Sequence, residues 1–130
     1  MAISQVIEND SLSCWIEDNI LYQVFLKSNI DLEMAKQAIE AKFAVCNGKD
    51  YPAFVDVRVI KNATREAREY FSGEKGAKYI SVAAILAPTL ISKLIGNFFI
   101  TFNRPPVKIK LFTDKEEALN WLHENMPKVI

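Results

Sequence analysis

Hydrophobic and polar residues follow a period of two near the start of the chain. The pattern is clear in SLSCWIE, residues 11–17, and a second run suited to a strand follows in ILYQVFL, residues 20–26. Alternation of this kind is typical of strands that bury one face. The two runs are joined by Asp18-Asn19, which tolerate a left-handed backbone, so the pattern predicts a tight β-hairpin. We also expect a short strand over residues 3–7.

A helical period replaces the alternation after residue 30. The helix is expected to begin at the N-cap Asp31 and to end at Asn47-Gly48, where glycine permits a left-handed turn. Its apolar stripe consists of Leu32, Ala35, Ile39, Phe43 and Cys46. Its polar face is expected to contain Glu33, Lys36, Gln37 and Glu40.

Two almost continuous apolar runs predict strands that are covered on both faces, as in parallel pairing. They are YPAFVDVRVI, residues 51–60, and SVAAILA, residues 81–87. A helix over residues 64–71 and a further helical turn over 74–79 are expected between them. The four residues GEKG at 73–76 follow a helix rather than a strand, so we interpret them as a helix break and not as a phosphate loop.

The last third of the chain predicts a helix, an edge strand and a final helix. The first helix starts at Pro88, contains LISKLIGNFF and stops at Arg104-Pro105-Pro106. In VKIKLF, residues 107–112, lysines alternate with apolar residues, which indicates an exposed face or sheet edge. A capping box over residues 113–116 starts the last helix.

The order of these elements predicts an α/β fold. We expect a single domain over residues 1–130, in which a mixed β-sheet with an N-terminal hairpin or meander carries about four helices. Helices and strands alternate from the hairpin to the end of the chain.

Composition and charge exclude several classes of protein. The 16 basic and 16 acidic side chains cancel, so the chain lacks the positive surplus that nucleic-acid binding requires. The N-terminus does not resemble a signal peptide, and no apolar run reaches the about 20 residues of a bilayer span. These observations predict a cytoplasmic protein that is not transmembrane. Two isolated cysteines and one histidine cannot form a zinc site, so no metal or other cofactor is expected.

Catalytic machinery is not visible in the sequence. The chain has no phosphate-binding glycine motif of the GxxxxGK[ST] or GxGxxG kind. Its only histidine, His123, lies near the end of the last predicted helix with no nucleophile close in sequence. We therefore expect no catalytic residues and a protein that is not an enzyme.

Asp56 and Arg58 are the first candidate polar site. If the strand over residues 51–60 is continuous, both side chains point to the same face, where a charge is costly unless it is paired. In one interpretation they lie at the carboxyl end of the strand and bridge to each other or to loops. Ligands of open α/β sheets also gather at that edge, so the pair is at the same time the first candidate site for a polar ligand or partner, although the structural interpretation is favoured.

The apolar helix after Pro88 is the second candidate surface. Its broad stripe is expected to face the sheet, and two or three apolar groups on the back form a contact patch beside a glycine. One interpretation is an interface for self-association; the other is a pocket beneath the helix, lined by its phenylalanines. The residues of this candidate surface are Leu90, Lys93, Gly96, Phe98, Phe99, Ile100 and Phe102.

Several segments together resemble a known family. They include FVDVR, AAILAP, SKLIGNFF and LFTDKEEALNWL, and with the hairpin they cover nearly the whole chain. The chain resembles bacterial STAS-like domains (SpoIIAA-like, anti-anti-sigma-factor-like) and, more narrowly, an uncharacterised STAS/Sec14-like group. The resemblance implies a non-enzymatic regulatory domain that binds a partner protein or forms a homodimer. The alternative that it implies is a domain that binds a lipid or another small apolar ligand.

The resemblance also implies a phosphorylation site. Regulatory STAS domains carry a phosphorylated serine or threonine after a buried strand, and Thr64 is the only hydroxyl in the matching segment RVIKNATRE. A phosphate at the start of the next helix would lie near Arg65 and Arg68. The usual Asp-Ser-(Ser/Gly) run is replaced here by residues 62–64, and Thr64 is also a suitable N-cap.

Overall fold

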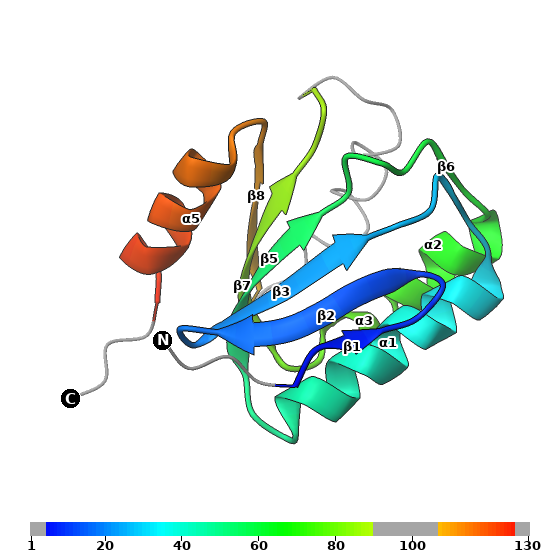
Figure 1. Cartoon of the computed structure of the whole chain (residues 1–130), viewed down its shortest axis with the longest axis horizontal. Coiled ribbons are helices and arrows are strands. Elements are labelled where there is room, and N and C mark those ends of the chain that lie inside the picture. The colour runs from blue at the N-terminus through cyan, green and yellow to red at the C-terminus, as the bar shows by residue number, and fades with distance from the viewer. Residues whose placement is uncertain (1–4, 90–106, 127–130) are drawn as a thin grey trace.

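The computed structural model describes residues 5–89 and 107–126, in which a six-stranded mixed sheet forms the centre (Figure 1). The strand order is β1-β2-β3-β5-β7-β8. The first three strands are antiparallel neighbours, whereas β3, β5, β7 and β8 are parallel. The bounds are β1 Ile7–Glu8, β2 Leu12–Glu17, β3 Ile20–Phe25, β5 Tyr51–Asp56, β7 Ile80–Leu86 and β8 Lys108–Phe112.

Helices cover both faces of this sheet. One face is covered by α1 (Leu32–Cys46), α2 (Arg65–Ser72) and α3 (Glu74–Ala77). The opposite face packs against α5 (Lys115–Glu124), as Figure 1 shows. The expected mixed α/β architecture is therefore confirmed, with four helices in the described part of the chain.

The predicted hairpin is confirmed. Strands β2 and β3 are joined by Asp18 and Asn19, whose φ angles of 51° and 65° are left-handed. Trp15 lies opposite Tyr22 in the register, and their rings stack at 5.0 Å with an interplanar angle of 2°. The strand expected over residues 3–7 appears as β1 at Ile7–Glu8, and residues 1–4 lie outside the described part.

Both predicted ends of α1 are confirmed. The Asp31 carboxylate accepts a hydrogen bond from the Met34 amide at 2.9 Å, and Asn47 adopts the left-handed conformation at the C-cap. Gln37, which was expected on the polar face of the helix, is half-buried. Its Oε1 accepts a 2.8 Å hydrogen bond from the hydroxyl of the fully buried Ser11, which attaches the start of β2 to the helix.

Two boundaries differ from the prediction, and one pair of strands was not predicted. Strand β5 ends at Asp56 instead of continuing to residue 60, because the chain turns and the Ile60 amide donates to the Val57 carbonyl. The N-cap of α5 is Asp114 and not residue 113, since the Asp114 carboxylate accepts from the Glu117 amide at 2.9 Å. A parallel pair of short strands, β4 (Asn29–Ile30) and β6 (Asn62–Ala63), was not predicted.

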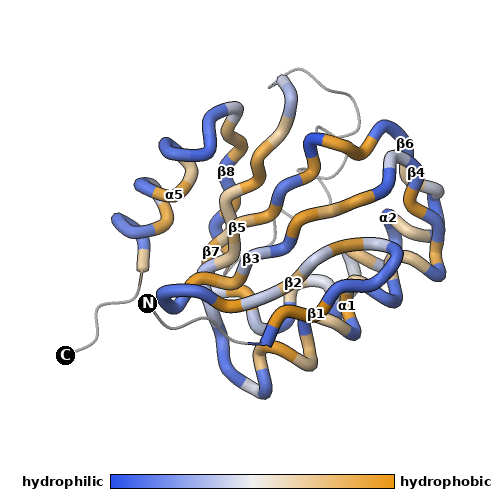
Figure 2. The backbone as a smooth tube through the Cα atoms, in the orientation of Figure 1, coloured by the Kyte–Doolittle hydropathy of each residue, from blue (hydrophilic) through white to orange (hydrophobic). Residues whose placement is uncertain are grey.

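The parallel strands separate two hydrophobic clusters. On the α1 face, Ala53 and Ile85 belong to the larger cluster, and on the α5 face Phe54 and Leu86 belong to the smaller one. Successive residues of β5 and β7 thus contribute to different clusters, which confirms that these strands are buried on both faces. In Figure 2, α5 alternates between hydrophilic and hydrophobic positions, as expected of a helix with a single buried face.

A close backbone contact positions α3. The break between α2 and α3 at Gly73 is confirmed, and Gly76 then packs directly on the last turn of α2. A Cβ atom at Gly76 would overlap the backbone carbonyl of Phe71, whereas a Cβ at Gly73 would lie 3.3 Å from the Tyr70 carbonyl oxygen. Only glycine therefore fits at position 76 without a shift of the backbone.

We expect Gly76→Ala to lower the free energy of unfolding by about 2–4 kcal/mol, because α3 must move away from α2. The matched variant Gly73→Ala should cost less than about 1 kcal/mol, since its neighbour needs to move by only a few tenths of an ångström. Urea denaturation of both variants measures the difference. Equal losses would contradict the close contact.

Candidate functional site

The expected pairing of Asp56 with Arg58 is confirmed. Asp56 ends β5 and is 8% exposed, and its Oδ2 lies 2.8 Å from the Arg58 Nη2. Arg58 Nε also donates to Oδ1 at 3.1 Å, and this hydrogen bonding raises the pKa of the guanidinium. The expectation that both residues lie on one strand face is wrong, because Arg58 lies in the turn after β5. Their role as a ligand or partner site stays a prediction.

Thr64 is the N-cap of α2, as expected. Its Oγ1 accepts a hydrogen bond from the Ala67 amide at 3.1 Å, and the residue is exposed. Arg65 extends along the helix to Glu69, with 3.0 Å between Nε and Oε1. Arg68 is half-buried and forms no ion pair with any residue of ranges 5–89 and 107–126. In those ranges, no hydrogen bond or ion pair joins this group to Asp56 or Arg58.

The candidate surface predicted on the apolar helix after Pro88 lies outside the described residues. Its residues are Leu90, Lys93, Gly96, Phe98, Phe99, Ile100 and Phe102. The interface and the pocket predicted for that helix therefore stay predictions.

The histidine, the two cysteines and the carboxylates of the described residues do not form a reactive cluster. His123 is exposed on α5, and the described residues contain no cluster of three or more His, Cys, Asp or Glu that could hold a metal ion. Cys14 and Cys46 are free and buried, and burial raises their pKa values to about 12 and about 11. Both thiols are thus protonated at neutral pH and poorly nucleophilic. None of the described helices has the length and apolar character needed to cross a membrane.

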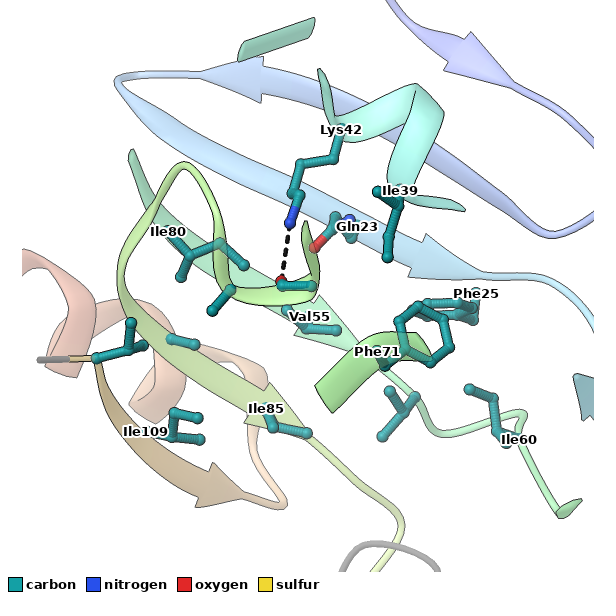
Figure 3. Close-up of a pocket in the computed structure, with 15 residues that line it drawn as sticks. Gln23, Phe25, Ile39, Lys42, Val55, Ile60, Phe71, Ile80, Ile85 and Ile109 are labelled. Atoms are coloured by element: carbon teal, nitrogen blue, oxygen red, sulfur yellow. Dashed lines mark hydrogen bonds between the residues drawn. The ribbon is translucent and has the colours of Figure 1, made fainter. Parts of the chain in front are cut away.

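A cavity of about 80 Å³ lies between the sheet and the helices α1 and α3 (Figure 3). Most of its wall is apolar, and the exceptions are two polar side chains, Lys42 and Gln23. The apolar wall includes Phe25, Ile39, Phe71, Ile80, Ile85 and Ile109. This cavity contains polar groups that the sequence did not single out.

Lys42 is the most unusual residue of the cavity. It projects from α1, is only 1% exposed, and its Nζ donates hydrogen bonds of 2.8 Å to the carbonyl oxygens of Lys75 and Gly76. Burial lowers its pKa to about 8. In the described part of the chain no carboxylate forms an ion pair with it. The sequence already indicated that Lys42 faces the core, because position 42 falls on the same helical stripe as Ile39 and Cys46.

Gln23 is the second polar group of the wall. It lies on β3 and is 7% exposed, and its side chain extends from the face of the sheet that α1 covers (Figure 3). Its carboxamide forms no hydrogen bond with another described residue. Position 23 lies between Leu21 and Phe25, which both face the core. The alternation of side chains along a strand therefore places the polar Gln23 side chain in the core, and this could be read from the sequence.

We expect the free energy of unfolding to rise with pH between about 8 and 9 because of Lys42. Its pKa is about 8 in the folded protein and 10.5 ordinarily. In this interval the unfolded chain therefore binds more protons, and raising the pH favours the fold. Above pH 9 the two cysteines lower the free energy of unfolding as the pH rises. Their thiols have a pKa of 9.0 in the unfolded chain and lose their protons there, whereas the buried thiols of the folded protein stay protonated.

Urea denaturation across this pH range measures the effect. Lys42→Met should remove the rise, and Lys36→Met, a half-buried position on the same helix, should preserve it. An identical slope in the wild type and in Lys42→Met would show that another group is responsible.

Comparisons with known proteins support the fold and show the family. The fold resembles the crystal structure of an uncharacterised protein of the DUF3478 family from Shewanella loihica PV-4, which is described as having a SpoIIAA-like fold. The similarity covers 92% of this chain and 93% of the other, with a TM-score of 0.58 and 19% identity, and it confirms the fold expected from the sequence. A search of curated proteins finds no match. The profile of the family described as "Domain of unknown function (DUF7793)" matches residues 14–126, and the chain belongs to this family.

Proposed function

We propose that this chain is a non-enzymatic regulatory domain that binds a partner protein at the surface around the start of α2. The observation that carries the proposal is the position of Thr64, exposed at the N-terminus of α2 with its hydroxyl oxygen 3.1 Å from the Ala67 amide nitrogen. The SpoIIAA-like fold supports a STAS-like regulatory domain, and the proposed partner binding goes beyond that likeness.

The local charges suit a phosphate at Thr64. The first turn of a helix presents unpaired N–H groups and the positive end of the helix dipole, which stabilise an anion. Arg68 is four residues further on, so it lies on the same side of α2 as Thr64. The ion pair of Arg65 with Glu69 is exposed at both ends, and exposed pairs are weak enough to exchange partners. Addition of a phosphate would therefore change the charge of this surface without disrupting the core.

A lipid carrier is the less favoured function. The cavity of about 80 Å³ in the described part of the chain is far below the several hundred Å³ of sites that enclose larger ligands. A long acyl chain would have to displace much of the cluster that contains Ile39 and Phe71. The proposal of a protein-binding domain requires no such rearrangement.

Thr64 variants separate the capping role from the charge. We expect Thr64→Ala to lower the free energy of unfolding by about 1 kcal/mol, because the Ala67 amide loses its acceptor. Thr64→Asn and Thr64→Asp should stay close to the wild type, since both side chains are good N-caps. Urea denaturation measures the three values. Equal stability of Thr64→Ala and the wild type would show that the cap contributes nothing.

The same variants test partner binding. Tagged protein should be expressed in its native cells, crosslinked and purified, and its bound proteins quantified by mass spectrometry. We expect a specific partner whose recovery differs about tenfold or more between Thr64→Asp and Thr64→Asn, because these isosteric side chains differ in charge. Arg68→Glu should also change its recovery.

Lys49→Glu is the control for a general charge effect, because Lys49 is exposed and lies after the C-terminal end of α1, not at the start of α2. A partner recovered equally with all variants would place the binding surface elsewhere. If no protein is enriched over an unrelated tagged control, the proposed function is wrong.

A further inference from the structure

The cavity beneath α1 contains a buried positive charge that has no counter-ion within residues 5–89 and 107–126. Lys42 is 1% exposed, and two backbone carbonyl oxygens are its hydrogen-bond acceptors. An ammonium group has three N–H donors, so these two acceptors leave one donor for another group. Removing a charge from water is costly unless an opposite charge compensates it, and no described carboxylate pairs with this lysine. The chemistry therefore calls for an anion at this position.

Gln23 supplies a second unmatched group on the same wall. It is more than nine-tenths buried, and its carboxamide has no hydrogen-bond partner among the described residues. Buried polar side chains are normally satisfied, and an unsatisfied one reduces stability. The carboxamide can donate two hydrogen bonds, and Gln23 lines the same cavity as Lys42 (Figure 3).

The remaining wall limits the size and polarity of a ligand. The aliphatic side chains of Ile39, Ile80 and Ile85 and the ring of Phe71 offer no charge or hydrogen bond to a ligand. An apolar cavity of about 150 Å³ accommodates benzene, so a cavity of about 80 Å³ suits a ligand with fewer non-hydrogen atoms than benzene. A matching ligand has one anionic end and a very short hydrocarbon part.

We propose that this cavity binds a short-chain monocarboxylate, whose carboxylate accepts hydrogen bonds from Lys42 and Gln23 and whose alkyl group contacts the isoleucine wall. The ligand provides the missing counter-charge for the ammonium and an acceptor for the carboxamide. The closest fits by size are acetate and propionate. The site is independent of the surface around Thr64, because it uses none of the residues assigned to partner binding.

The test is a titration of the full-length chain, labelled at isoleucine methyl groups, with sodium propionate followed by NMR. We expect saturable shifts of the Ile39 and Ile85 methyl resonances with a dissociation constant between about 0.01 and 10 mM. Ile20, which belongs to the cluster on the opposite face, should be unaffected. Sodium chloride and 1-propanol serve as controls for a bare anion and for an uncharged molecule of similar size.

Variants of the two polar residues identify the site. Gln23→Met keeps the length of the side chain and removes its hydrogen bonds, so propionate affinity should fall about tenfold or more. Lys42→Met should abolish binding, and Lys36→Met should leave it unchanged. If Lys42→Met fails to fold, the result for Gln23→Met still decides the question.

Four results would contradict the proposal. The first is no saturable shift at cavity resonances with propionate. The second is equal affinity for propionate and 1-propanol, which would mean that the cavity selects ligands by their size and not by their charge. The third is an unchanged affinity in Gln23→Met. Tighter binding of octanoate than of propionate would also refute the proposed size of the ligand.

Discussion

The need to cover both faces of β5 and β7 governs the architecture of this protein. Their side chains alternate between two hydrophobic clusters, so neither face can be left to solvent. One layer consists of α1, α2 and α3, and α5 covers the second face. Parallel pairing requires long connections between neighbouring strands, and those connections supply covering helices. The chain thus uses its apolar residues mainly for the two clusters, and most of its charged side chains lie outside them.

Lys42 is the exception to this division. It occupies a position of the inward stripe of α1 that an apolar residue would ordinarily fill, and its ammonium group reaches the carbonyl oxygens of α3. The contact depends on the backbone of α3 lying close to α2, which Gly76 permits. A helix of four residues is thereby attached to the main core by one charged side chain. This arrangement places polar atoms on the wall of a cavity that is otherwise apolar.

Local signals explain why much of the fold could be predicted. Asp18-Asn19, Asp31 and Asn47 each determine the backbone through their own conformational preference, and the structure confirms all three. The same is true of Thr64 as a cap. The turn after Asp56 and the pairing of β4 with β6 depend on contacts between distant segments, so the local pattern did not reveal them.

The candidate site was predictable only in part. The ion pair of Asp56 and Arg58 followed from spacing, because a charge on a buried strand needs a near partner. Lys42 and Gln23 were missed for a different reason. Their positions on the stripe and on the strand can be read from the sequence, but a long polar side chain at such a position often extends to solvent. Only the placement of α3 over the sheet shows that the Lys42 side chain stays buried and does not extend to solvent.

The edges of the sheet have a consequence for how the protein behaves at high concentration. One outer strand of the described sheet is β1, with two residues, and the other is β8, where Lys108 and Lys110 are exposed. A very short strand and repeated lysines are two ways in which natural sheets prevent addition of a strand from another molecule. Growth of the sheet into fibres is therefore disfavoured at both ends. Any association between copies would depend on side-chain surfaces instead of shared backbone hydrogen bonds.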